Sequence, residues 1–506
     1  MLAHKHITKI VAAVMAAAVC LCLCAVAFSG QLTAWAGDKG IAQEYETALF
    51  DTSSILSVNI QMDEADWNDM LENAMAETYY QCNVEVNGTM FYQVGIRPKG
   101  NTSLSAIAND DTTDRYSFKL EFDHYVDGQT CFGLDKLILN NNYADATNMK
   151  EALIYDMYQY LGADASLYNY AKISVNGEYW GVYLALEGVE DSFQLRNSGT
   201  ESGELYKPES MDMGGGNFQD RPDGMPEGDA EPPGGMDRNS GGADLNYTDD
   251  DLDSYETIWD GEVTKTNQAD HERVVKALKN IAEGNDLETY MDIDNLLRYM
   301  AVHVFSVNED SLSGTMAHNY YLYESDGKLS LIPWDYNLAL GGMGGMPGGS
   351  GETEESSGAT SVVNSPIDDA FSGTDFFDTL LENETYHSQY EAYLQQLVSE
   401  YINGGGFDAF YERVRSQIDE LVETDPTAFY SYDEYETAAE TLYQVVKLRG
   451  QSIQGQLDGT IPSTEEAQRD SDALVDASDL DVSVMGTMNM GGGNGKAPAK
   501  PQNESN

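Results

Sequence analysis

The 506-residue sequence contains few cysteines and few histidines. Three of its five cysteines, Cys20, Cys22 and Cys24, lie in an apolar run near the N-terminus, which leaves Cys82 and Cys131 for the rest of the chain. A framework of several disulfides is therefore excluded, and one disulfide or two free thiols remain as alternatives. The seven histidines form no HExxH motif and no Cys/His cluster, which argues against a zinc hydrolase.

Positive charge is also scarce. Lys and Arg number 27 against 86 Asp and Glu, which gives a net charge of −59 at pH 7. Because such a surface repels a phosphate backbone, the sequence excludes nucleic acid as a partner. A polyanionic ligand would need a metal ion or a local cationic pocket to offset this field. The 41% apolar content and 32 tyrosines nevertheless provide for a large core.

One long apolar run is present, and it lies near the N-terminus. Lys5 and Lys9 precede the apolar stretch 10–28, and Ala34-Trp35-Ala36 has the small-x-small pattern of a signal-peptidase site. We expect residues 1–36 to be a secretory signal peptide, with an uncleaved membrane anchor as the alternative. The predicted location is extracellular or on the cell or spore surface, with no membrane contact beyond this segment.

Composition divides the rest of the chain into one domain with insertions. Residues near 211–242 and 341–360 are rich in Met and Gly, and residues 461–506 form an acidic, Gly/Met-containing tail. Such segments bury too little surface to offset chain entropy, so we expect loops and a disordered tail. Residues 37–460 are then the folded domain.

Hydrophobic periodicity predicts different structures in the two halves of this domain. Residues 55–140 alternate in the pattern of β-strands, whereas 146–161, 271–283 and 292–307 have helical spacing. Residues 366–457 are expected to be almost entirely helical. The sequence therefore predicts an α+β fold of two lobes, with a strand-rich N-terminal lobe and a helical C-terminal lobe.

Several polar residues lie at the predicted ends of strands and helices. No GxSxG motif is present, and the loop that begins at Gly95 has Asn101 where a Walker phosphate loop requires lysine. Arg97 and Lys99 flank a turn in a chain with few cations. Lys119 lies in a strand, on the face opposite its aromatic residues.

Acidic residues follow in an order that suits phosphoryl transfer. Glu151 lies at the start of a helix, Asp310 follows another helix, and Asp335 lies between Trp and Tyr. Taken singly, Lys119 is typical of a solvated strand residue and Asp310 of an acid at a helix end or turn. An acid between two aromatic residues is costly unless it is paired or bound to metal. Phosphoryl transfer requires a cation at the phosphates, a carboxylate that fixes this cation, a proton-accepting Asp, and Asp or Asn ligands for magnesium.

With these motifs in view, the sequence resembles the spore coat protein H (CotH) kinase-like family. The resemblance covers roughly residues 55–455 and is carried by GIRPKGNTS (95–103), SFKLEF (117–122), LNNNYADAT (139–147), VNGEYWGVY (175–183), GELYK (203–207), NEDS (308–311), HNYY (318–321) and PWDYN (333–337). It implies a remote, atypical protein-kinase-like fold. It also implies ATP and Mg²⁺ or Mn²⁺ as cofactors, and Ser/Thr of secreted or surface proteins as substrate.

The resemblance assigns a role at the nucleotide to five residues. Lys119 is expected to hold the ATP phosphates, with Glu151 as its partner from the following helix. Arg97 and Lys99 are expected near the phosphates, in place of a glycine-rich loop. Glu187 is expected near the hinge, where adenine would bind.

The resemblance also assigns roles to an acid–amide set. Asp310 is expected to be the catalytic Asp and Asp335 the main magnesium ligand, with Asn319 and Asn337 as further ligands. Asn319 lies nine residues after Asp310, which is longer than the spacing in a kinase catalytic loop. Many relatives have a second Asp where Asn337 stands, and an amide in its place removes one charge from the metal site.

These residues give one leading function and two alternatives. The leading prediction is a secreted, ATP-dependent protein Ser/Thr kinase that acts on exported or surface proteins. The first alternative is a non-catalytic surface or spore-coat assembly or adhesion protein on the same fold. The second is transfer of another group from ATP, such as AMP.

Overall fold

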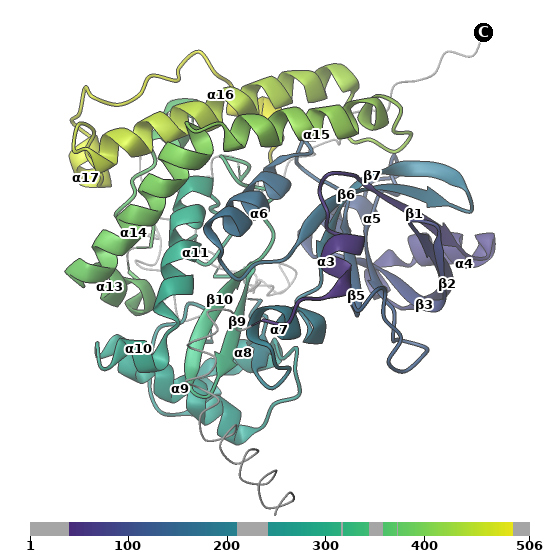
Figure 1. The fold of residues 1–506 in the computed structure, drawn as a ribbon, viewed down its shortest axis with the longest axis horizontal. Helices are drawn as coiled ribbons and strands as arrows, with labels where there is room; N and C mark the ends of the chain where they lie inside the picture. Colours follow the sequence, from purple (N-terminus) through teal and green to yellow (C-terminus); the bar gives the residue numbers. More distant parts are fainter. Residues whose placement is uncertain (1–39, 210–240, 315–316, 344–357, 372, 489–506) are drawn as a thin grey trace, which may run out of the picture.

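The computed structural model describes residues 40–209, 241–314, 317–343, 358–371 and 373–488. The predicted signal peptide, most of the two Met/Gly-rich insertions and the end of the tail lie outside these ranges. The strand-rich part of the chain lies beside the helical part (Figure 1). Within the described ranges, no helix is both long enough and apolar enough to cross a membrane.

Seven strands of the N-terminal part form a closed barrel in the order β1-β2-β3-β4-β5-β7-β6. Their bounds are β1 Leu56–Gln61, β2 Tyr80–Val86, β3 Thr89–Lys99, β4 Ser117–Glu121, β5 Lys136–Asn140, β6 Tyr168–Val175 and β7 Glu178–Glu187. Neighbouring strands are antiparallel, except that β1 and β6 pair in parallel and close the barrel.

The closed barrel corrects one part of the predicted fold. The α+β class and the order of a strand-rich part before a helical part are confirmed, but the barrel is not kinase-like. Closure depends on pairing of Leu56–Ile60 with Ala171–Val175, which lie more than one hundred residues apart. Alternation predicts which face of a strand is buried and does not predict which edge strands will meet.

The two faces of β4 are those that its alternation predicts. Phe118 and Leu120 are fully buried in the barrel core, whereas Lys119 lies on the outer face and is partly exposed. Cys82 and Cys131 are also in this core and are free thiols, so the structure shows the unpaired alternative. The outer face of β3, β4 and β5 therefore carries the polar residues that the sequence singled out.

Short helices surround the barrel, and longer ones build the rest of the molecule. The elements near the barrel are α3 Glu44–Ala48, α4 Glu64–Glu72, η1 Ala74–Ala76, α5 Thr102–Ala108, α6 Lys150–Leu161 and α7 Asp191–Ser198. The helical part has η2 Leu252–Tyr255, α8 Glu256–Asp260, α9 Gln268–Ala282, α10 Leu287–Tyr290, α11 Ile293–Ser306, α12 Ala359–Asn364, α13 Asp375–Leu381, α14 Glu384–Gln396, η3 Leu397–Ile402, α15 Gly406–Glu423 and α16 Tyr432–Leu457.

A small antiparallel sheet lies within the helical part. It consists of β8 Glu204–Tyr206, β9 Tyr320–Ser325 and β10 Lys328–Pro333, in the order β10-β9-β8. Helix α11 packs on this sheet through a face that is buried along nearly its whole length. The end of α11 and the end of β10 therefore face the barrel from one compact unit.

The predicted tail is ordered over its first half. After α17 Glu465–Gln468, the turn η4 Val482–Met485 packs on α16, and Val482 and Met485 are buried. The Ala146 N–H donates to the Met485 carbonyl at 3.0 Å, and the buried Lys150 Nζ donates to the Gly486 carbonyl at 3.1 Å. The segment through η4 and Gly486 thus covers the start of α6.

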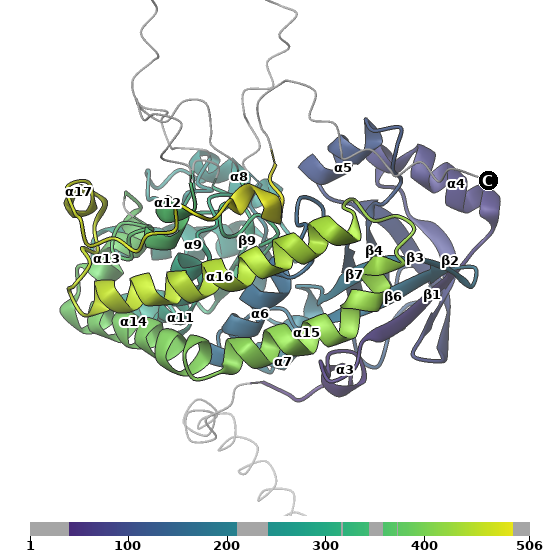
Figure 2. The same cartoon turned by 90° about the horizontal axis from the view of Figure 1, so that it is seen from above.

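Helices α15 and α16 run side by side from the helical part to the barrel (Figure 2). Arg115 Nη1 contacts Asp425 Oδ2 at 2.7 Å in the connection between these helices, and both side chains are at most 2% exposed. The Val182 N–H of β7 donates to the same carboxylate at 2.9 Å. The Arg115 guanidinium also lies over the Tyr183 ring, 4.7 Å from its centroid. This buried pair fastens the barrel to the helical part.

Replacing Arg115 with Met should therefore destabilise the protein strongly. The change leaves the buried Asp425 carboxylate without its counter-charge, a loss that typically costs about 3–5 kcal/mol. Arg469→Met is the matched control, because Arg469 pairs with Glu465 on the surface, where the two side chains are 62% and 67% exposed. Urea unfolding should show a change below about 1 kcal/mol for the control. Equal losses in both variants would contradict the role assigned to the buried pair.

Candidate functional site

Polar side chains from both parts of the molecule meet at the ends of β3, β5 and β10. Lys99 ends β3, and its Nζ donates to Asn140 Oδ1 at 3.2 Å. The Asn140 amide in turn donates to Glu151 Oε2 at 2.8 Å. The predicted partner of Glu151 was Lys119, but the structure places Lys99 there instead. Lys99 lies two residues beyond Arg97 on the same outer face, one step nearer to α6.

Glu151 is a buried carboxyl at the start of α6. It is 3% exposed, and burial, with the nearby charge of Asp335, raises its pKa to about 8. Its Oε1 atom is buried and has no hydrogen-bond partner among the described residues. The Tyr336 backbone N–H also approaches this carboxyl and lowers its pKa, but it makes no hydrogen bond of normal geometry to Oε1, so this oxygen could still accept from a ligand, a cation or a water.

Asp335 lies two residues after the end of β10 and is partly buried. Its backbone is left-handed, with φ of 60°, which is unusual for a residue other than glycine. The Asn308 amide donates to the Asp335 carbonyl at 3.2 Å and fixes this turn. Burial raises the pKa of Asp335, and the charge of Lys99 opposes that shift. The charges of both acids raise the pKa of Lys99 against the effect of burial. Asp335, Glu151 and Lys99 therefore form one electrostatic cluster.

Asp310 lies in the loop after α11 and is held by the two residues that precede β9. His318 Nε2 donates to Asp310 Oδ1 at 2.6 Å, and the Asn319 amide donates to the Asp310 carbonyl at 2.8 Å and to Oδ2 at 3.1 Å. Each carboxylate oxygen thus accepts one hydrogen bond. The sequence predicted Asp310 and Asn319 but gave no role to His318, although a histidine directly before Asn319 was the available signal.

The cations form a row on the outer face of the barrel. Arg97 on β3 is the cross-strand partner of Lys119 on β4. Lys119 Nζ lies 3.2 Å from Glu190 Oε1, and Lys136 Nζ lies 3.0 Å from the same oxygen. Burial lowers the pKa of Lys119 and of Lys99. The predicted cationic residues are therefore neighbours, but Lys119 pairs with Glu190.

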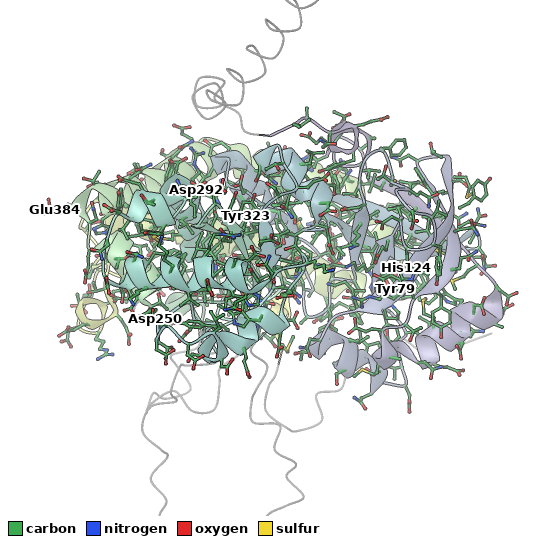
Figure 3. All side chains as sticks on the ribbon, turned by 90° about the horizontal axis from the view of Figure 1, so that it is seen from below. Tyr79, His124, Asp250, Asp292, Tyr323 and Glu384 are labelled. Atoms are coloured by element: carbon green, nitrogen blue, oxygen red, sulfur yellow. The ribbon has the colours of Figure 1, made fainter. Side chains whose placement is uncertain are left out.

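The outer end of this row is aromatic. Arg97 is ion-paired with Glu77 and lies over the Tyr79 ring at 5.4 Å from its centroid. Tyr79 stacks on His124 with ring centroids 4.0 Å apart, and both are labelled on the barrel in Figure 3. At the inner end lies Lys207, which follows β8. Its charge lowers the pKa of both Lys99 and Asp335. The sequence assigned no role to Lys207.

Glu187 is not available to a ligand. Its Oε1 accepts from Tyr45 Oη at 2.6 Å and from Arg196 Nε at 2.8 Å. Its Oε2 accepts from Arg196 Nη2 at 2.6 Å and from the Leu167 N–H at 3.0 Å. A carboxylate has about four acceptor positions, and these four bonds fill them. The side chain therefore secures α7 to the barrel, and its place near the adenine of ATP stays a prediction.

The predicted metal ligands supply only oxygen donors. Across the described ranges, no three His, Cys, Asp or Glu side chains are grouped for metal binding. The Asn337 side-chain N–H donates to the Tyr143 carbonyl at 2.9 Å. The side-chain oxygen of Asn337 is therefore the atom that could bind a metal. Magnesium is usually bound by one or two carboxylates together with phosphate oxygens and water. Asp335, with Glu151 and its unpartnered oxygen nearby, fits that requirement.

Replacing Glu151 with Gln should change how stability depends on pH. The raised pKa means that the folded protein keeps a proton which the unfolded chain releases above about pH 4.5. The free energy of unfolding should therefore fall between about pH 4.5 and 8, by at most about 1.4 kcal/mol per unit. Glu151→Gln removes this loss, so the free energy of unfolding of the variant should increase relative to that of the wild type as pH rises. Equal differences at pH 5.5 and pH 8.5 in urea unfolding would refute the shift, and Glu465→Gln is the exposed control.

Comparison with known proteins agrees with this arrangement. The model of the family described as CotH kinase protein matches residues 96–453. Inner spore coat protein H of Bacillus subtilis (strain 168) is 27% identical over 215 residues, which cover 42% of this chain. The match spans 52%, about half, of that relative's length. Because the family match extends from β3 to α16, it includes the site residues of both parts, and the chain belongs to the CotH kinase protein family.

Proposed function

We propose that this protein is a protein kinase that transfers the γ-phosphoryl group of ATP to Ser or Thr of exported or surface proteins. The observation that carries the proposal is the meeting of Asp310 and Asp335 with Lys99 where the barrel faces the small sheet. The charge of Asp310 raises the pKa of Asp335, and that of Lys99 lowers it. Two acids and a cation whose charges act on one another match the groups that phosphoryl transfer uses.

Phosphate binding, proton acceptance and metal binding would fall to different residues. Lys99 would bind phosphate oxygens, with Lys207, which is ion-paired with Glu209, as a second cation beside it, and Asp310 would accept the proton of the substrate hydroxyl. The hydroxyl oxygen then bonds to the γ-phosphorus while the bond to the β–γ bridging oxygen breaks, and ADP leaves. His318 and Asn319 hold the Asp310 carboxylate in one orientation. A Mg²⁺ or Mn²⁺ ion at Asp335 would neutralise charge on the phosphates.

A role at the spore or cell surface supports the choice of substrate. The similar protein from Bacillus subtilis is named an inner spore coat protein. The predicted signal peptide would bring this chain to the same side of the membrane as surface proteins. That name also favours the alternative of a coat-assembly protein without catalysis, and the following experiment separates the two functions.

Asp310→Asn and Asp335→Asn should both abolish phosphoryl transfer, for different reasons. Asp310→Asn removes the proton acceptor, so transfer from labelled ATP to a mixed protein substrate should fall by about 100-fold or more with nucleotide binding retained. Asp335→Asn removes a metal ligand, so it should also weaken Mg²⁺-dependent ATP binding. Asp326→Asn, in the β9–β10 turn, is the control. A wild type that neither binds Mg²⁺-ATP nor transfers phosphate would leave only the assembly function.

The two lysines should also differ. Lys99 lies beside Asn140 and Glu151, whereas Lys119 is paired with Glu190 and Lys136 lies next to it. Lys99→Met should therefore reduce kcat/KM for ATP by about 100-fold or more, and Lys119→Met by much less. The measurement is steady-state kinetics with ATP varied. The larger loss in Lys119→Met would restore the predicted assignment of the phosphate-binding lysine.

A further inference from the structure

A buried histidine outside the acid cluster connects the elements that carry the acids. His303 lies on α11 and is 2% exposed. Its Nδ1 atom is 2.9 Å from Tyr336 Oη, and its Nε2 atom is 2.7 Å from Ser313 Oγ and 3.1 Å from Ser311 Oγ. Tyr336 Oη is also 2.6 Å from Tyr158 Oη. The imidazole thus joins the loop after its own helix to Tyr336, and Tyr336 continues the network to α6.

The hydrogen-bond directions in this network follow from the available protons. Ser311 donates its only hydroxyl proton to the Asn308 carbonyl at 2.7 Å, so its oxygen can only accept from the imidazole. His303 Nε2 therefore carries the proton, and Nδ1 accepts from the Tyr336 hydroxyl. Tyr336 has then used its own proton, so Tyr158 donates to it. Hydrogen bonds in this network are thus donated in one direction, from Tyr158 on α6 through Tyr336 and His303 to the loop after α11.

Two members of this hydrogen-bond network are next to a residue of the candidate site, and a third shares a helix with one. Tyr158 lies on α6, whose first turn carries Glu151. Tyr336 directly follows Asp335, and Ser311 directly follows Asp310. The three acids belong to segments with no sequence continuity, and this network is a direct polar link among all three segments.

The surroundings of His303 keep it neutral. Its ring lies 5.4 Å from the Tyr299 ring and 5.2 Å from the Phe371 ring, measured between centroids. Burial in this apolar site lowers the pKa of His303 to about 3. The imidazole therefore has one donor and one acceptor at any pH near neutrality, and both are used. A neutral imidazole of fixed tautomer is a rigid spacer between the Asp310 loop and the Asp335 turn.

We propose that His303 is a positioning residue that sets the separation and orientation of Asp310 and Asp335. This inference rests on the proposed kinase function, for which the two acids must be placed together. His303 does not touch the reacting groups, and it acts through Ser311, Ser313 and Tyr336. Its loss should leave Lys99 and Asp335, which would bind the Mg²⁺-ATP, in place and displace Asp310 from them.

Three substitutions test this role in the full-length protein. His303→Phe keeps the ring shape and removes both hydrogen bonds. His303→Gln places an amide where it can donate to the serines, and His303→Asn places an amide oxygen where it can accept from Tyr336. His387→Gln on α14 is the matched control, because that histidine bonds Asp368. Thermal unfolding of every variant separates a loss of fold from a loss of position.

The kinetic result expected is a loss in kcat with ATP binding preserved. His303→Phe should lower kcat by about 100-fold, with KM for ATP within about threefold of the wild type, because small misplacements cost that much. His303→Gln should recover about tenfold of this loss, and the control should match the wild type. A His303→Phe kcat within threefold of the wild type would overturn the proposal, as would a Gln variant no faster than the Phe variant.

A second measurement does not depend on activity. In amide hydrogen exchange, His303→Phe should speed exchange in 307–314 and 334–338 by about tenfold, with the barrel strands unchanged. The conservative variants serve in its place if His303→Phe does not fold. If the wild type transfers no phosphate, the kinase function fails while this measurement still decides the inference. Unchanged exchange in both segments would overturn the positioning role.

Discussion

The buried pair of Arg115 and Asp425 is the contact on which the arrangement of the molecule depends. It lies where α15 and α16 reach the barrel, and it is tied to the barrel backbone at Val182. The candidate site is assembled across the same boundary, with Lys99 from the barrel and Asp335 from the small sheet. A site of this kind exists only while the two parts keep a fixed relation, so a rigid, desolvated joint near its edge is a requirement of the chemistry.

Much of the local structure could be predicted from the sequence. The alternation in 117–122 placed Phe118 inside and Lys119 outside, and the acid between Trp334 and Tyr336 was recognisable as a costly position. These predictions depend on neighbours within a few residues, which a single sequence displays. The closure of the barrel through β1 and β6 depends on a pairing over more than one hundred residues, which no local pattern contains.

Partners of charged residues could not be predicted for the same reason. Glu187 was assigned its place by the family resemblance, and nothing in the sequence shows that Tyr45 and Arg196 approach it from other elements. Lys119 and Lys99 are both lysines on one face, and only the structure shows that Lys99 is linked to Glu151 through Asn140 while Lys119 contacts Glu190. Predicting residue types for the site was therefore easier than predicting their pairing.

The contact of the C-terminal segment with the start of α6 has a consequence for the timing of folding. Lys150, next to Glu151, reaches the carbonyl of Gly486, and Met485 binds the loop that precedes the helix. Ribosomes and export machinery both deliver a chain from its N-terminus. The barrel can therefore form early, but the region around Glu151 is completed only after residue 486 has emerged. A chain that is still being synthesised, or still in transit, lacks the finished site.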